Sequence, residues 1–250
     1  MKSPSLLRVF TSSAIFSFKA QFSWLNPPMW ITMKLVLTLS QMSFFEFVGQ
    51  FVVSSGQAPS SLISYIVIGN AVQALSWNTV FSVINITGQD KWDGTLQLTL
   101  ATPAQRLPLF VGRSMIHIFD GLLSVFVSFI FAAFLFGVNF GSTNLLGLIV
   151  TLLLTGFTMA GFGLLVGGFS FYFRDPLVFA NIFTFILLIF CGINFQIQYL
   201  PQGIQFVSYL IPLTYGVEAG RQVIEGSTLI GVSSLIWGML VTGVISFALG

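Results

Sequence analysis

The chain has 250 residues, of which 55% are hydrophobic and only 6% are charged, and its mean hydropathy is +0.94. Nine Lys and Arg and seven Asp and Glu cannot cover the surface of a water-soluble particle of this size, so most of the surface must face lipid. The same numbers exclude a disordered or collagen-like chain. A net charge of +2 is too small to indicate nucleic-acid binding, and the single cysteine, Cys191, excludes an intramolecular disulfide and a cysteine-rich metal site.

Residues 1–28 predict a helix that lies in the membrane interface. On such a helix, one face carries Leu7, Phe10, Ala14, Phe18 and Leu25, whereas Arg8, Ser12 and Lys19 share another. A secretory signal is disfavoured, because the apolar stretch is short and no small-residue cleavage site follows it.

Uncharged stretches then predict six membrane-spanning helices, since a helix needs about 20 apolar residues to cross the hydrocarbon core. These stretches cover 47–89, 121–173, 176–217 and 226–250, and turn residues near 54–59 and 139–144 divide the first two. The predicted spans are residues 30–53, 61–84, 115–138, 145–169, 177–195 and 229–248.

The distribution of cations predicts that both termini are cytoplasmic. Loops 54–60 and 139–144 carry no Lys or Arg, and Arg221 is the one cation on the presumed outer side. The cations that precede the first span or follow the second and fourth spans are Lys2, Arg8, Lys19, Lys91, Arg106, Arg113 and Arg174.

The longest polar interval follows the second span and predicts a short cytoplasmic helix over 94–101. Asp90 and Asp93 precede it, and acidic residues are favourable at the amino end of a helix. Thr102 before a proline ends it.

The same short helix has a face that is suited to docking. Leu96 and Leu100 share this face, and Arg106 and Arg113 mark the cytoplasmic boundary of the membrane. Such a helix can receive force from a separate motor protein. The alternative is an amphipathic loop helix that rests on the headgroups.

Residues 196–228 predict a re-entrant or outer-surface helical hairpin before the sixth span. The apolar piece 203–211 is too short to cross the membrane, and Pro201 and Pro212 bracket it. Four glutamines make the segment too polar for lipid, so its backbone must be shielded by protein. The alternative is a seventh span, which would place the carboxyl terminus outside.

The predicted fold is therefore one all-α transmembrane domain over residues 1–250. It consists of the interfacial helix 1–28, spans one to five over 30–195, the hairpin 196–228 and the sixth span 229–248.

Catalytic and phosphate-binding motifs are absent from the sequence. The single histidine, His117, excludes a zinc-protease motif, and no Lys stands in a Walker phosphate-binding loop. We interpret His117 as a packed helix-end residue, with a proton relay as the alternative. The glycines of 156–168 predict a helix-packing face, with a hinge as the alternative.

Charges inside spans are costly and count as candidate functional residues. Lys34 and Asp120 lie near enough to the cytoplasmic boundary to extend toward the headgroups. Glu46 lies deeper, in the outer half of the first span, where it would line a path or bind a polar partner across the subunit. The alternative is that the first span ends early. Phe179 and Phe183 would suit an apolar substrate, although packing against lipid or protein is the commoner role of phenylalanine.

Two motifs resemble the membrane subunits of type-2 ATP-binding-cassette (ABC) exporters. The first is GTLQLTLATPAQR at 94–106 followed by LFVGR at 109–113, and the second is LPQGIQFVSYLIPLTYGVEAGR at 200–221. The resemblance covers nearly the whole chain and is closest to the drug and antibiotic branch, while a related branch carries polysaccharides and teichoic acids. An acidic–basic pair such as Glu-Arg usually precedes GTL in these families, whereas this chain has Gln89-Asp90-Lys91 there.

The second motif is the more specific part of the resemblance. Its residues in the outer hairpin are Leu200, Pro201, Pro212, Thr214, Tyr215, Glu218 and Arg221.

The resemblance implies a permease that pairs with a second membrane subunit, as a homodimer or heterodimer, and with two cytoplasmic ATPase subunits. This chain would not be an enzyme and would hold no cofactor or metal, because ATP and magnesium would bind to the ATPase. It would lie in the cytoplasmic (inner) membrane of a prokaryote. The residues expected to couple to the ATPase are Asp90, Lys91, Asp93, Gly94, Thr95, Leu96, Leu100, Arg106, Arg174 and Asp175.

The leading hypothesis for function is export of amphipathic or hydrophobic compounds, such as drugs or antibiotics. The alternative cargo is a lipid-linked polysaccharide or teichoic acid. An ion-coupled secondary transporter is a less favoured class, because it predicts an internal repeat that the sequence lacks and only Glu46 resembles a relay residue. A membrane-embedded enzyme would need paired histidines or an acidic cluster.

Overall fold

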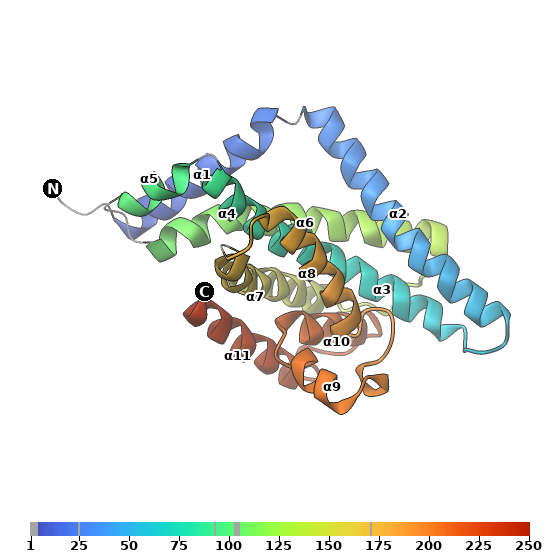
Figure 1. Ribbon diagram of the computed structural model, residues 1–250. Helices are drawn as coiled ribbons and strands as arrows, with labels where there is room; N and C mark the ends of the chain where they lie inside the picture. The colour runs from blue at the N-terminus through green and yellow to red at the C-terminus, as the bar shows by residue number, and fades with distance from the viewer. Residues whose placement is uncertain (1–4, 25, 93, 103–105, 171) are drawn as a thin grey trace.

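The computed structural model describes residues 5–24, 26–92, 94–102, 106–170 and 172–250 (Figure 1). All the regular secondary structure of these residues is helical. In chain order the helices are α1 (Leu6–Trp24), α2 (Pro27–Ser54), α3 (Ser61–Ser76), the π-helix η1 (Trp77–Phe81), α4 (Ser82–Trp92), α5 (Thr95–Ala101), α6 (Arg106–Phe136), α7 (Leu145–Ser170), α8 (Pro176–Phe190), the 3₁₀-helix η2 (Ile197–Tyr199), α9 (Gln202–Ser208), α10 (Pro212–Ile224) and α11 (Ser233–Leu249). The all-helical prediction is confirmed for these residues.

Among the described residues, four helical segments are long and apolar enough to cross a membrane. They are Pro27–Ser54, Ser61–Trp92, Pro108–Phe136 and Leu145–Ser170, and each contains or overlaps one of the first four predicted spans. The second of them is continuous through α3, η1 and α4. The suggestion that the first span ends early is wrong, because α2 continues well beyond Glu46.

The last two predicted spans fall on shorter apolar helices, α8 and α11. At a rise of 1.5 Å per residue, α8 is about 22 Å long and α11 about 26 Å, whereas the hydrocarbon core is about 30 Å thick. The helices begin and end within five residues of the predicted boundaries 177–195 and 229–248, and their role as membrane spans stays a prediction. The fifth span ends early because Gly192 adopts a φ of +67°, and turns that include Gly226 (φ +102°) precede α11.

The predicted third span, 115–138, is placed too far along the chain at its carboxyl end. Helix α6 ends at Phe136, since Gly137 has a φ of +66° and the Val138 amide donates to the Ala132 carbonyl at 3.0 Å. The left-handed glycine ends the helix, and the backward hydrogen bond satisfies one of its last carbonyls.

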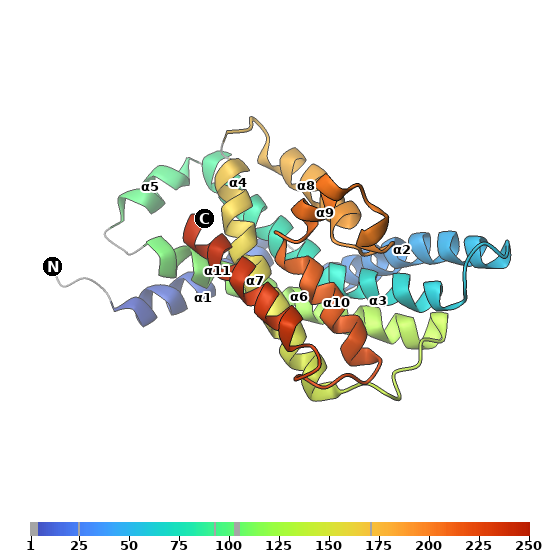
Figure 2. The ribbon, with the colours of Figure 1, turned by 90° about the horizontal axis from the view of Figure 1, so that it is seen from below.

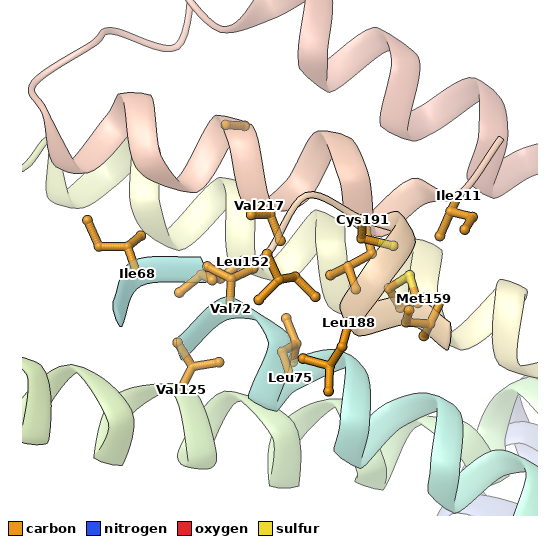
Figure 3. Packing of buried hydrophobic residues seen from close by; sticks show 14 of the residues in the cluster. Ile68, Val72, Leu75, Val125, Leu152, Met159, Leu188, Cys191, Ile211 and Val217 are labelled. Carbon is orange, nitrogen blue, oxygen red and sulfur yellow. The ribbon is translucent and has the colours of Figure 1, made fainter. Parts of the chain in front are cut away.

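The core lies where α3, α7 and α10 meet, with α6 and the end of α8 beside them (Figure 3). Val72 and Leu75 of α3, Met159 of α7 and Val217 of α10 are fully buried, as is Leu187 of α8. A segment that the sequence describes as an outer hairpin thus contributes one of the central helices.

The glycines of α7 allow close packing. A Cβ at Gly156 would lie 2.7 Å from Cγ2 of Ile118, and one at Gly163 would lie 3.3 Å from Cα of Val80. These contacts support the prediction that the small residues of the fourth span form a packing face.

The region 196–228 contains η2, α9 and α10 but no helix of spanning length. Helix α10 packs against α3, α7 and α11, so its backbone is shielded by protein as the hairpin prediction required. The structure offers no support for a seventh span within 196–228.

The first helix is confirmed over Leu6–Trp24, and it packs along α6. Leu25, which the prediction placed on its apolar face, lies outside the described residues, and the position of α1 in a membrane interface stays a prediction. Figures 1 and 2 place α1, α5 and the end of α11 toward one end of the molecule, and the α2–α3 connection at the opposite end.

Candidate functional site

An ion pair joins the end of the second span to the start of the third. Arg113 of α6 donates from Nη1 to Oδ2 of Asp90 at 2.5 Å and from Nη2 to Oδ1 at 3.1 Å. The two side chains are only 11% and 13% exposed. A paired, largely buried arginine–carboxylate contact is geometrically specific, so it fixes α4 on α6 next to the segment that is predicted to couple to the ATPase.

The loops that follow the second and fourth predicted spans, which are both predicted to be cytoplasmic, meet near the Asp90–Arg113 ion pair. Lys91 donates from Nζ to the Phe173 carbonyl at 3.0 Å, and α4 packs against α8. A Cβ at Gly88 would lie 2.6 Å from Cβ of Pro176, so the helices approach closely. The structure therefore brings the predicted residues Asp90 and Lys91 together with the loop that carries Arg174 and Asp175.

Asp175 begins α8. Its Oδ1 accepts hydrogen bonds from the Leu177 amide at 2.9 Å and the Val178 amide at 3.2 Å, and Pro176 occupies the first turn. This is a helix N-cap, a local role that the sequence reading had not assigned to Asp175. Arg174 beside it is exposed.

The predicted short helix after the second span is present as α5 (Figure 2). Gly94 has a φ of +68°, which lets the chain turn into α5, and Thr95 donates from Oγ1 to Oδ1 of Asp90 at 3.3 Å. Asp93 lies outside the described residues, as do the side chains of Leu96, Leu100 and Arg106. Their coupling roles stay predictions.

The outer motif centres on Arg221, which is 6% exposed. Its guanidinium donates from Nη1 to the Gly192 carbonyl at 3.0 Å and from Nη2 to the Ile193 carbonyl at 2.7 Å. Nε and Nη2 also donate to the Tyr65 carbonyl, at 3.3 and 3.1 Å. Arg221 thus connects α10, α3 and the end of α8. Its ion pair with Glu218, at 3.8 Å, lies toward the surface.

Other residues of the motif organise the short helices. Thr214 donates from Oγ1 to the Ser208 carbonyl at 2.6 Å, and Tyr215 donates to the Tyr209 carbonyl at 2.9 Å. Pro201 is the N-cap of α9, Pro212 begins α10, and the Leu200 carbonyl accepts from Nε2 of Gln205 at 2.7 Å. These contacts hold α9 against α10.

The three predicted pathway residues are all in contact with other parts of the protein. Glu46 is fully buried on α2 and accepts from Nε2 of Gln50 at 3.2 Å. The ring of Phe179 stacks on Phe173 with centroids 4.4 Å apart, and Phe183 contacts both Phe179 and Phe162. A pathway role for these residues stays a prediction.

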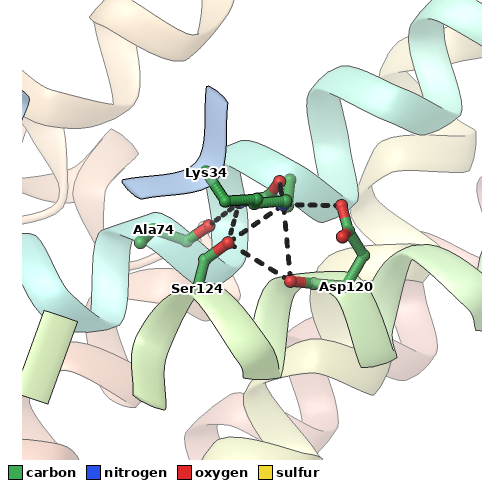
Figure 4. Close-up of polar contacts among 5 residues, drawn as sticks. Lys34, Ala74, Asp120 and Ser124 are labelled. Atoms are coloured by element: carbon green, nitrogen blue, oxygen red, sulfur yellow. Dashed lines mark hydrogen bonds and ion pairs between the residues drawn. The ribbon is translucent and has the colours of Figure 1, made fainter. Parts of the chain in front are cut away.

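A buried polar cluster lies between α2, η1 and α6 (Figure 4). It was not predicted from the sequence. Lys34 forms an ion pair with Oδ2 of Asp120 at 2.6 Å, so the prediction that both residues extend toward the headgroups is wrong. Asn78 and Ser124 complete the cluster. Opposite charges in two spans were the signal in the sequence, because charges in lipid tend to pair.

Comparison with known proteins identifies one family. Residues 12–224 match the family described as ABC-2 type transporter. No curated protein matches the chain.

Proposed function

Because the chain belongs to the ABC-2 type transporter family, we propose that it is the transmembrane subunit of an exporter for amphipathic or hydrophobic compounds, such as drugs or antibiotics. The membrane domain of this family is the permease component of an ABC transporter and has no ATPase activity, and ABC-2 permeases work with ABC ATPase subunits. ATP and magnesium would accordingly bind to the partner. The full transporter would contain two ATPase copies and a second membrane subunit, identical to this chain or different from it.

The observation that carries this proposal is the convergence of α4, the start of α5 and residues 172–175. The Asp90–Arg113 ion pair and the hydrogen bond from Lys91 to the Phe173 carbonyl connect these segments. An ATPase that contacts α5 would therefore push on a braced assembly rather than on a free loop. In this arrangement both termini are cytoplasmic, and the chain lies in the cytoplasmic membrane of a prokaryote.

The proposed cargo is supported by the resemblance to the drug and antibiotic branch and by the abundance of phenylalanine, of which the chain has 29. Apolar and aromatic surfaces bind apolar compounds without needing a specific charge. A lipid-linked polysaccharide or teichoic acid remains the alternative cargo of the same machinery. Substrate-stimulated ATP hydrolysis by the reconstituted complex, measured with each class of compound in turn, separates the two.

Introducing Asp at Gly94 or Leu96 tests the docking site. We expect copurification with the cognate ATPase to fall about tenfold, which corresponds to about 1.4 kcal/mol of binding free energy. Membrane insertion and detergent-extracted yield should not change. Normal copurification and normal stimulation of ATP hydrolysis in both variants would show that α5 does not dock the ATPase.

Two matched variants control this experiment. Gly94→Asn carries the same cost of a left-handed backbone as Gly94→Asp but adds no charge. Asn139→Asp adds the same charge at an exposed turn between α6 and α7. Both controls should bind the ATPase as the unmodified chain does.

A further inference from the structure

The Lys34 ammonium group reaches from α2 into a site formed by α6 and η1 (Figure 4). It donates to Oδ2 of Asp120 at 2.6 Å, to Oγ of Ser124 at 3.0 Å and to Oδ1 of Asn78. The lysine and aspartate side chains are 13% and 8% exposed. The contacts satisfy the cation in a segment where an unpaired charge would be costly.

The π-helix places Asn78 at the centre of this cluster. Asn78 donates from Nδ2 to the Ala74 carbonyl at 2.7 Å and to Oγ of Ser124 at 3.1 Å, while its Oδ1 accepts from Lys34. One side chain therefore contacts its own helix, α6 and α2 at once. Single π-helical turns within longer helices occur frequently at functional positions.

The same α6 helix carries both ion pairs. Arg113, which binds Asp90, and Asp120, which binds Lys34, are seven residues apart, so they lie on roughly the same face about 10 Å apart. The helical segment η1–α4 runs without a break from Asn78 to Asp90. Spans two and three are thus connected by the Asp90–Arg113 ion pair and by the Asn78–Ser124 hydrogen bond. The ion pair lies next to the predicted ATPase contact.

Span one has few other buried contacts. Met42, Glu46 and Gly49 are the buried residues of α2, and all three lie in its second half. Figure 1 shows the first turns of α2 leaning away from the other helices. The side chain of Lys34 therefore connects the first half of α2 to α6 and η1.

We propose that Lys34 and Asp120 are positioning residues that hold span one on spans two and three, so that a displacement of α4 by the ATPase is passed to α2. The proposal rests on the proposed function, because it takes the ATPase to act next to α4. A buried ion pair contributes little net stability but is a specific contact, since within the described part of the chain Lys34 and Asp120 form no ion pair except with each other. This specificity is what a coupling contact requires.

Distance measurements between spin labels test the proposal in the complex with the cognate ATPase, reconstituted in lipid nanodiscs. One pair of labels, at Trp92 and Trp237, reports on α4, and a second pair, at Val36 and Trp237, reports on α2, because Trp237 lies on α11, outside the three connected spans. All three positions are exposed, and the buried Cys191 is replaced by alanine. Labelled chains are diluted with unlabelled chains, so that each distance lies within one chain.

In the unmodified pair, a non-hydrolysable ATP analogue should shift both distances. In Lys34→Met and in Asp120→Asn, the α4 distance should still shift while the shift at α2 is lost. The double variant Lys34→Asp/Asp120→Lys should recover the α2 shift, which a purely structural role of either residue alone would not predict. Lys19→Met and Glu225→Gln, at exposed positions, serve as matched charge controls.

The possible failures are distinguishable. If the α4 distance of the unmodified complex does not respond to nucleotide, the proposed function fails together with this inference. If α4 responds but α2 shifts equally in Lys34→Met, or does not shift in the unmodified complex, only the positioning role is overturned. A double variant that behaves like the two single variants also overturns it.

Discussion

The guanidinium carbon of Arg221 lies 3.4 Å from the centre of the Tyr65 ring, while its nitrogens donate to the Tyr65 carbonyl and to two carbonyls at the end of α8. The Tyr65 hydroxyl donates to one of those, Gly192, at 2.9 Å. One arginine and one tyrosine thus join three segments that are far apart in the sequence. The turn after α8 is held by this arrangement, because the carbonyls of Gly192 and Ile193 are satisfied by Arg221 and Tyr65 rather than by a further helical turn.

Replacing Arg221 with lysine should destabilise the protein strongly. A lysine ammonium group cannot reproduce the planar set of donors, so buried carbonyls lose their partners at a cost of about 3 kcal/mol. For a chain of this size, the apparent midpoint of thermal unfolding should fall by about 6–12 °C. Fluorescence-detected size-exclusion chromatography after heating measures it. Arg8→Lys, at an exposed site, should leave the midpoint unchanged, and an equal midpoint in Arg221→Lys would contradict this account.

Gly69→Ala should disturb the same region from the side of α3. A Cβ at Gly69 would lie 3.1 Å from the carbonyl carbon of Ile193 and would also meet the Arg221 side chain. Overpacking against backbone costs about 1–3 kcal/mol, so thermal stability should fall. Gly168→Ala is the matched control, because no heavy atom lies within 4 Å of its added methyl group. Alanine is the better helix former, so Gly168→Ala should be as stable as the unmodified chain or more so.

Asp175 should act as a helix cap. Asp175→Ala is expected to cost about 1 kcal/mol and to lower the apparent unfolding midpoint, whereas Asp175→Asn keeps an acceptor oxygen and should remain near the unmodified value. ATPase copurification, measured on the same samples, provides the contrast. If both variants lose ATPase binding while their stability is unchanged, Asp175 contacts the partner instead of capping α8.

The orientation of the chain can be tested by labelling single cysteines. Ser55→Cys and Asn139→Cys lie in exposed turns, and both should react with a membrane-impermeant maleimide added to intact cells. Tyr172→Cys, at a position that is 88% exposed, should react only after the membrane is opened. The native Cys191 is 1% exposed and provides an unreactive background. Labelling of Tyr172→Cys alone in intact cells would invert the predicted orientation.

The positions of the long helices could be predicted because lipid leaves the backbone few choices. A spanning segment must satisfy its own hydrogen bonds, so an uncharged stretch of sufficient length becomes a helix, as α7 shows. The short helix after the second span could also be predicted, from Asp90 before it and Thr102 after it. Helix ends were less accurate where a glycine adopts a left-handed conformation, at Gly137 and Gly192.

The pairing of charges could not be predicted in the same way. Lys34 lies 86 positions from Asp120, and Arg221 lies 156 positions from Tyr65. Nothing in the hydropathy of one segment indicates which other segment packs beside it, so a lysine near a membrane boundary is equally compatible with an extended side chain and with a buried ion pair. For the same reason, the N-cap role of Asp175 and the bracing of Asp90 by Arg113 emerged only from the structure.

Composition and local spacing are enough to show that this protein is an all-helical membrane protein and that its sequence has no Walker phosphate-binding loop. The packing of the helices was needed to show that α10 lies in the core, that Arg221 binds the turn after α8 and that Lys34 binds Asp120. These features depend on which helix faces meet. In lipid that choice is made by close packing and by the need to pair each buried charge, and both are properties of neighbours in space rather than in the chain.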